Sequence, residues 1–371
     1  MTPAHERRPI HTAYIGAHLF RHGLTAEWGE LALRALAEHA PDAPALAAAL
    51  AAVDDHIDEQ LYARVREKLQ REPVEDLRID FEDGFGTRSD QEEDEAARAA
   101  GAEVAAGLAR RSLPSFLGIR IKPLAAQGAA RAARTLELFV TSLVERSGGK
   151  LPATFTVTLP KVAMLEEVTA LVRLLDGLES RLRLAKGALT LELMVETPHA
   201  ILGPDGRCPL PALVAAAGGR CGGVHFGVYD YSAALEIAPS HQGLRHPACD
   251  YARHVMQLAL AGAGVVLSAG STNVLPVPPR EHVLRAWRLH FQDVRHSLGR
   301  GFYHGWDLHP AQLVTRYVAT YTFFRECLEP EAAGSVLEDP AARRVRATLV
   351  RRALDCGAIT QAEADAFGRA A

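Results

Sequence analysis

Lysine is scarce in this sequence of 371 residues. Lysine and arginine together number 41, and only five are lysines: Lys68, Lys122, Lys150, Lys161 and Lys186. Lys122 and Lys161 each end a short apolar run that reads as a β-strand. These two positions are therefore candidates for a chemical or ion-pairing role.

Cysteine and long apolar runs are also scarce. The five cysteines form no CxxC pair and are odd in number, which argues against a disulfide framework or a zinc site. No uninterrupted apolar stretch reaches the roughly 18 residues of a membrane span, and MTPAHERRPIHTAYIG lacks the apolar run of a signal peptide. We expect a cytoplasmic protein with no membrane partner.

An excess of either charge is missing as well. The 41 basic and 45 acidic residues give a net charge of −4, which offers no general attraction for nucleic acid. Hydrophobic residues make up 48% of the chain, too many for a disordered protein. The length fits one large barrel or two smaller domains.

Eight short runs rich in β-branched or aromatic residues recur along the chain, and stretches with helical spacing separate them. The predicted strands are His11–Gly16, Leu77–Glu82, Phe116–Lys122, Thr154–Pro160, Ala188–Val195, Gly223–Tyr229, Gly264–Ala269 and Phe302–Leu308. Strict alternation requires parallel strands, and eight units predict a (β/α)₈ TIM barrel, with an open doubly wound sheet as the alternative.

The barrel is predicted to occupy residues 1–310. Residues 17–70 exceed one crossover helix, so we expect two or three helices there as an insertion. Residues 311–371 follow the eighth strand and are predicted to form a helical extension, either a cap or a subunit contact.

Alternation along three strands places charge on the face turned into the barrel. Apolar residues of the second, third and fifth strands share one face, so the opposite face carries Arg78, Asp80 and Glu82, then Gly118, Arg120 and Lys122, then Glu192, Met194 and Glu196. Buried charges need partners, a cation or water. This pattern predicts a polar site at one end of the barrel.

Carboxylates and an arginine follow two of these strands. Asp80, Glu82 and Asp83 stand where barrel enzymes build active sites, with a solvated acidic loop as the alternative. The guanidinium of Arg120 can hold a substrate carboxylate, or it can pair internally with Asp80 or Glu82.

Lys161 ends the fourth strand and admits two interpretations. A Schiff-base nucleophile needs a lowered pKa, whereas neighbouring carboxylates would raise the pKa and favour an ion-paired ammonium. We favour the ion pair. His199, His225 and His309 lie at predicted strand ends and could assist proton transfer, although lone histidines more often serve packing.

Glu196 and Asp230 each end their own predicted strand. Two hard oxygen ligands leave room for water and substrate oxygens, which suits Mg²⁺ better than zinc. Asp230 does not share the inward parity of His225, Gly227 and Tyr229, so this pairing requires the strand to end before Asp230.

In order along the chain, IDFEDGFG, GIRIKP, TLPKV, LMVETPH, HFGVYDYS and DLHPAQL resemble the citrate lyase beta-subunit-like branch of the HpcH/HpaI aldolase superfamily. The resemblance spans residues 77–313. The sequence departs from the family pattern in the 17–70 insertion and in the residues of several motifs. It implies a (β/α)₈ barrel, a homo-oligomer (trimer or hexamer) and Mg²⁺- or Mn²⁺-dependent C–C bond chemistry.

By this resemblance, Glu196 and Asp230 would bind the metal and Arg120 would hold substrate oxygens. Asp80, Glu82, Asp83 and Lys161 would form the supporting polar shell. The predicted function is a lyase or aldolase acting on a small carboxylate, either a 3-hydroxy acyl-CoA of the citramalyl or malyl type or a 4-hydroxy-2-oxo acid. The alternatives are a Schiff-base aldolase using Lys161 and a non-catalytic metabolite-binding barrel.

Overall fold

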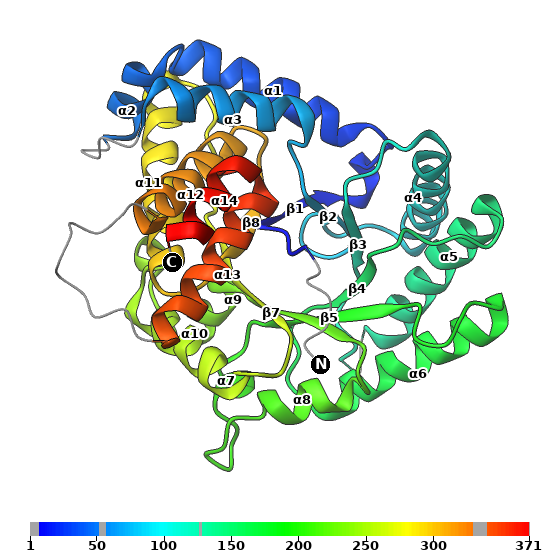
Figure 1. Cartoon of the computed structure of the whole chain (residues 1–371). Coiled ribbons are helices and arrows are strands. Elements are labelled where there is room, and N and C mark those ends of the chain that lie inside the picture. The colour runs from blue at the N-terminus through cyan, green and yellow to red at the C-terminus, as the bar shows by residue number, and fades with distance from the viewer. Residues whose placement is uncertain (1–6, 52–56, 126–127, 329–339, 371) are drawn as a thin grey trace.

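Eight parallel strands close into a barrel in the order of the chain (Figure 1). The computed structural model describes residues 7–51, 57–125, 128–328 and 340–370. The strands are β1 (His11–Gly16), β2 (Asp76–Asp80), β3 (Phe116–Arg120), β4 (Phe155–Leu159), β5 (Thr190–Val195), β6 (Cys221–Phe226), β7 (Val266–Ser271) and β8 (His304–Asp307). Pairing of β1 with β8 closes the ring, which confirms the predicted TIM barrel.

Helices follow the strands and cover the outside of the barrel. They are α1 (Leu24–His39), α2 (Ala43–Leu50), α3 (Glu59–Arg71), α4 (Asp90–Arg110), α5 (Ala129–Ser147), α6 (Leu165–Leu182), α7 (Pro198–Ile201), α8 (Leu210–Ala216), α9 (Val228–Ala234), α10 (Pro247–Ala259), α11 (Arg280–Gly299), α12 (Gln312–Leu328), α13 (Pro340–Cys356) and α14 (Gln361–Ala370). Two short 3₁₀ helices, η1 (Ala17–Leu19) and η2 (Pro239–His241), lie in the connections. No helix among these described residues is long and apolar enough to cross a membrane.

The segment between β1 and β2 contains three α-helices, as its length predicted. Asp42 and Asp58 cap α2 and α3, since their carboxylates accept hydrogen bonds from Ala45 N (2.8 Å) and Leu61 N (2.7 Å). α1 packs against α3, and α2 packs against α11. The insertion therefore forms part of the helical layer around the barrel.

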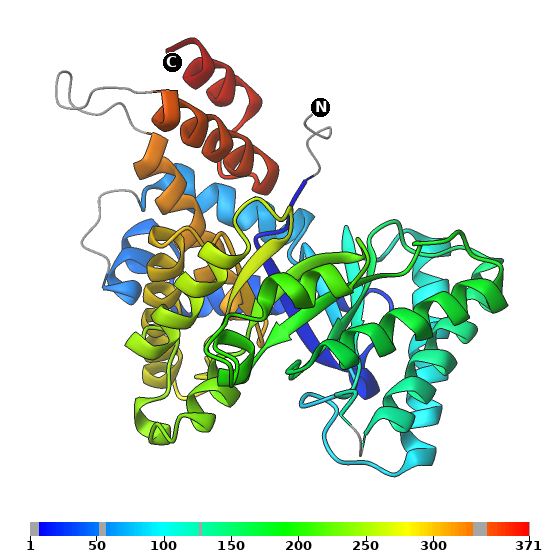
Figure 2. The ribbon, with the colours of Figure 1, turned by 90° about the horizontal axis from the view of Figure 1, so that it is seen from below.

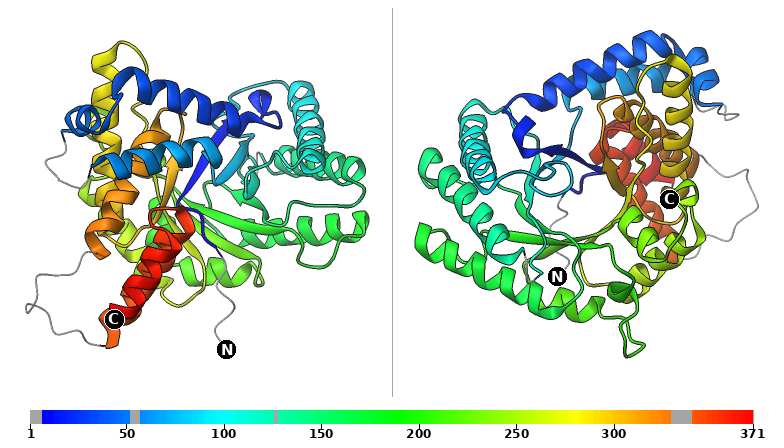
Figure 3. Two further views of the ribbon diagram at one scale, coloured as in Figure 1. Left: turned by 45° about the horizontal axis from the view of Figure 1, so that its top comes forward. Right: turned by 180° about the vertical axis from the view of Figure 1, so that it is seen from behind.

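The chain after β8 divides into a buried helix and two peripheral ones. α12 packs against α11 and α3 and is buried along nearly its whole length. α13 and α14 lie at the end of the barrel where the strands begin (Figures 2 and 3), held there by Tyr321 Oη to Cys356 O (2.9 Å) and Arg64 to Glu363 (2.6 Å). The boundary at residue 310 and a capping or subunit-contact role stay predictions.

The predicted inward-facing charges meet inside the barrel. Arg78 of β2 reaches Glu192 of β5 through Nη2 to Oε1 (2.6 Å) and Nε to Oε2 (3.1 Å), and it also pairs with Asp76. Thr158 Oγ1 donates to the same Glu192 carboxylate (3.0 Å). The inward-facing prediction is wrong for Lys122, which lies beyond the end of β3 and pairs with Glu93 of α4.

Candidate active site

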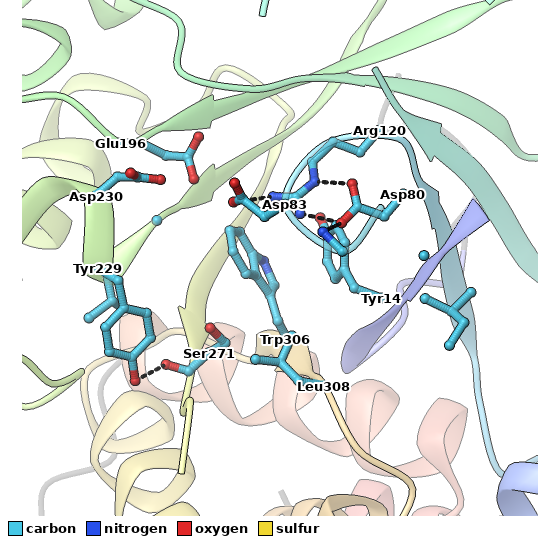
Figure 4. A pocket seen from close by; sticks show the side chains of 15 residues that line it. Tyr14, Asp80, Asp83, Arg120, Glu196, Tyr229, Asp230, Ser271, Trp306 and Leu308 are labelled. Atoms are coloured by element: carbon cyan, nitrogen blue, oxygen red, sulfur yellow. Dashed lines mark hydrogen bonds and ion pairs between the residues drawn. The ribbon is translucent and has the colours of Figure 1, made fainter. Parts of the chain in front are cut away.

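A cavity of about 410 Å³ opens at the carboxyl ends of the strands (Figure 4). Its polar lining comes from the predicted carboxylates and arginine, and its apolar lining comes mainly from β1, β8 and α9. The lining residues are Tyr14, Ile15, Gly16, Asp80, Asp83, Gly84, Arg120, Glu196, Gly227, Val228, Tyr229, Asp230, Ser271, Trp306 and Leu308. Glu82 and Lys161 contact this lining through ion pairs.

Asp80 holds Arg120 in a fixed orientation. Arg120 Nε donates to Asp80 Oδ1 (2.6 Å), and Nη2 donates to Oδ2. Asp80 is itself fixed by the backbone N–H groups of Glu82 (2.9 Å) and Gly84 (2.7 Å). A Cβ at position 84 would lie 2.5 Å from Asp80 Oδ2, so glycine leaves space for this arrangement.

The rest of the Arg120 side chain faces the acidic loop and an aromatic ring. Nη1 lies 3.1 Å from Glu82 Oε2 and 3.6 Å from Asp83 Oδ2, and the guanidinium lies 5.1 Å from the centre of the Tyr14 ring. Burial opposes the charge, but Asp80 and Glu82 keep the pKa of Arg120 well above its usual value. Arg120 is therefore a permanent buried cation at the cavity wall.

Lys161 lies among carboxylates. Its Nζ is 2.5 Å from Glu82 Oε1, 3.0 Å from Asp230 Oδ2 and 3.5 Å from Asp83 Oδ1. Burial opposes the charge, yet Glu196, Glu82 and Asp83 raise the pKa of Lys161 above its usual value. A protonated amine is not nucleophilic, so these contacts favour the ion-paired interpretation over imine formation.

The two neighbouring acids of the loop after β2 differ in their proton affinity. Burial raises the pKa of Glu82 to about 7, although Arg120 and Lys161 oppose this shift. For Asp83, burial is outweighed by the hydrogen bond with Glu82 and by Arg120 and Lys161, which lower the pKa. Asp83 is thus the carboxylate that stays ionised, and it lines the cavity.

Glu196 and Asp230 lie side by side on the cavity wall (Figure 4). Glu196 is buried, and its Oε2 accepts a hydrogen bond from Lys161 N (2.8 Å). Burial raises the pKa of Glu196, and the nearby charge of Asp230 adds to this shift despite Lys161 and Arg120. A bound cation would relieve that electrostatic cost.

The donor set at this position fits Mg²⁺. Glu196 and Asp230 supply carboxylate oxygens facing a cavity with room for further oxygen ligands. The described residues contain no group of three or more His, Cys, Asp or Glu side chains arranged to hold a metal.

The prediction that the sixth strand continues through Tyr229 is wrong. Because the strand ends earlier, the alternation of side chains along a strand does not apply to Asp230. β6 ends at Phe226, and Asp230 lies in the first turn of α9. Gly227 N donates to Val195 O (2.9 Å) at this junction, which brings the start of α9 beside the end of β5. The helical turn therefore directs Asp230 toward the same cavity as Glu196.

Sequence reasoning missed the aromatic part of the site. Tyr14, Tyr229 and Trp306 line the cavity, but nothing in the local sequence separates them from ordinary core residues. Closure of β1 against β8 places the Tyr14 and Trp306 rings 5.1 Å apart.

The three candidate histidines are not among the described residues that line the cavity. His199 lies on α7, and His309 Nδ1 accepts a hydrogen bond from Ala311 N (3.2 Å). His225 lies inside the barrel behind Trp306, whose indole N–H donates to it.

Eight parallel strands that close into a ring place this protein in the class of (β/α)₈ barrels, and its acidic cavity lies at the carboxyl ends of these strands. The chain belongs to the family described as "Domain of unknown function (DUF6986)", whose model matches residues 3–370. No curated protein matches the sequence significantly.

Solved structures with the same fold include malate synthase of Haloferax volcanii. Its magnesium/glyoxylate complex is 13% identical with a TM-score of 0.56, and the match covers 99% of this chain and 91% of that one. Its pyruvate/acetyl-CoA ternary complex is 16% identical with a TM-score of 0.53, covering 79% and 71%. Protein CitE of Mycobacterium tuberculosis is also similar, at 16% identity and a TM-score of 0.48, covering 93% and 98%.

Proposed function

We propose that this protein is a divalent-metal-dependent lyase that breaks or forms a C–C bond in a small carboxylated substrate. The substrate would be a 3-hydroxy acyl-CoA of the malyl or citramalyl type or a 4-hydroxy-2-oxo acid. The observation that carries the proposal is the pair of Glu196 and Asp230 on the wall of a cavity that already holds an anchored arginine.

The charge balance of the site supports the need for a divalent cation. Among its described residues, five carboxyl groups face two cations, and burial raises the pKa of two of the five, Glu82 and Glu196. The carboxyl groups are those of Asp80, Glu82, Asp83, Glu196 and Asp230, and the cations are Arg120 and Lys161. An anionic substrate would be repelled by such a cavity. Mg²⁺ held by Glu196 and Asp230 would supply the missing positive charge and polarise a carbonyl oxygen.

The protein's own groups account for binding and proton transfer. Arg120, which Asp80 fixes and which lines the cavity, would neutralise a substrate carboxylate or a developing oxyanion. Asp83 lines the cavity, and its carboxylate would take the hydroxyl proton. Lys161 keeps Glu82 and Asp230 in place by ion pairing.

The fold relatives support this substrate class. The malate synthase structures are a magnesium/glyoxylate complex and a pyruvate/acetyl-CoA ternary complex, which pair a metal or an acyl-CoA with a small oxo acid. A cavity of about 410 Å³ has room for a small oxo acid, or for the acyl end of a thioester whose coenzyme A part lies outside. We also propose a homo-oligomer, which the resemblance of the sequence to the citrate lyase beta-subunit-like branch implies.

The test is metal-dependent turnover of malyl-CoA, citramalyl-CoA and a 4-hydroxy-2-oxo acid by the wild type and by Glu196→Gln and Asp230→Asn. We expect turnover with Mg²⁺ or Mn²⁺, loss with EDTA, and loss in both variants because each removes a charged ligand. Glu137→Gln, which changes an exposed carboxylate of α5, is the matched control and should remain active.

Calorimetric titration with MgCl₂ separates binding from catalysis in the same variants. Mg²⁺ binding without turnover of any substrate would favour a non-catalytic metabolite-binding barrel. Turnover that survives EDTA, together with borohydride trapping at Lys161, would establish the Schiff-base alternative.

A further inference from the structure

Trp306 is tethered from inside the barrel. Its indole lines the cavity, and its Nε1–H donates to Nδ1 of His225 at 3.0 Å (the indole is labelled in Figure 4). Since an indole N–H can only donate, Nδ1 of His225 must be the acceptor. The ring proton of a neutral His225 is therefore on Nε2.

The other nitrogen of His225 faces an anchored carboxylate. Nε2 lies 3.3 Å from Glu192 Oε2, and Arg78 and Thr158 hold that carboxylate in place. A Cβ at position 223 would lie 3.3 Å from His225 Nε2, so Gly223 leaves the two groups room to meet. The Glu192 carboxylate fixes the imidazole in the state that accepts from Trp306.

Aromatic contacts connect Trp306 to the substrate-holding arginine. The Trp306 ring lies 5.1 Å from the Tyr14 ring, and the Tyr14 ring lies 5.1 Å from the Arg120 guanidinium. All three side chains line the cavity. A rotated Trp306 indole would leave Tyr14 without this ring contact and change the surface that meets a substrate.

We propose that His225 is a positioning residue. By accepting a hydrogen bond at Nδ1, it sets the orientation of the Trp306 indole, which forms a wall of the substrate cavity. The substrate part of this inference rests on the proposed function. The orientation of Trp306 can be measured without any substrate.

Two substitutions of His225 separate its two contacts. In His225→Asn, the amide oxygen can take the place of Nδ1 and keep the acceptor for Trp306. In His225→Gln, the longer side chain carries its amide to the place of Nε2 and leaves the indole N–H without its acceptor. Circular dichroism and thermal melting establish that each variant is folded.

The first measurement is the emission of Trp306, obtained as the difference between each variant and the same variant carrying Trp306→Phe. We expect the His225→Asn emission to match the wild type and the His225→Gln emission to shift. A folded His225→Gln protein with wild-type emission would overturn the proposal.

The second measurement is steady-state kinetics with whichever acyl-CoA or oxo acid the protein turns over. Loss of one hydrogen bond predicts a rise in KM of about fivefold in His225→Gln and in Trp306→Phe, with kcat little changed. The double variant should be no worse than either single variant, because both remove the same bond. Rises in KM that add up in the double variant would overturn the proposal. Absence of any activity would count against the proposed function, and the emission of Trp306 would still test the role of His225.

Discussion

At the residue scale, Gly227 shows how the site depends on the absence of a side chain. The carboxylate of Glu196 lies directly against this glycine: an added Cβ would be 2.3 Å from Glu196 Cγ and 2.4 Å from Oε1. The φ angle at Gly227 is −96°, an ordinary value for any residue. The requirement for glycine is therefore one of space, imposed by Glu196.

We expect Gly227→Ala to displace Glu196 and weaken Mg²⁺ binding at least about tenfold, since ligand position determines metal affinity. Overpacking should also lower the free energy of unfolding by about 1–3 kcal/mol. Calorimetric titration and urea unfolding measure the two effects. Gly222→Ala is the control, because nothing lies within 4 Å of a Cβ there. Equal Mg²⁺ affinity in both variants would refute the role of Gly227.

At the scale of elements, a charged pair joins β2 and β5 through the middle of the barrel. Arg78 is buried and the Glu192 side chain is 13% exposed, and the charge of Arg78 holds the pKa of Glu192 well below its usual value against the effect of burial. Asp76 also pairs with Arg78, and its carboxylate accepts a hydrogen bond from Thr12 Oγ1 (2.8 Å). The two strands are thus connected by charges as well as by the β-sheet.

Arg78→Met should lower the free energy of unfolding by about 3–5 kcal/mol, because it leaves buried carboxylates without their cation. Arg181→Met provides the comparison, since Arg181 and Glu137 form an ion pair in which each side chain is 53% exposed. That variant should lose less than about 1 kcal/mol. Urea unfolding curves near neutral pH measure the free energy of unfolding of both variants. A similar decrease in both would contradict the stabilising role assigned to Arg78.

The elements also show how far the sequence alone could predict this structure. All eight strands were predicted, because alternating apolar residues such as Leu77 and Ile79 mark the face covered by helices. The sixth strand is predicted to continue through Tyr229 because Val228 and Tyr229 favour strands, whereas the chain turns into α9 after Gly227. The role of Trp306 depends on closure of the barrel, which local sequence patterns do not encode.

At the scale of the whole molecule, metal binding and folding should be linked. Glu196 comes from β5 and Asp230 from α9, so an unfolded chain does not bring these ligands together. A cation that binds only the folded protein stabilises it.

We therefore expect Mg²⁺ at about one hundred times its Kd to raise the free energy of unfolding by about 2.7 kcal/mol. EDTA should reverse this gain, and Glu196→Gln should abolish it. Thermal unfolding followed by circular dichroism measures the effect, with NaCl of matched ionic strength as the control. A wild-type melting temperature that does not respond to Mg²⁺ would rule out binding at this position.

The placement of α13 and α14 has a practical consequence. These helices lie at the end of the barrel where the strands begin, and β1 starts at that same end (Figure 2). The cavity opens at the opposite end. A tag, fluorophore or surface tether joined to the chain next to β1 or to α14 would thus leave the cavity mouth facing solution, so the immobilised protein could be screened for ligands.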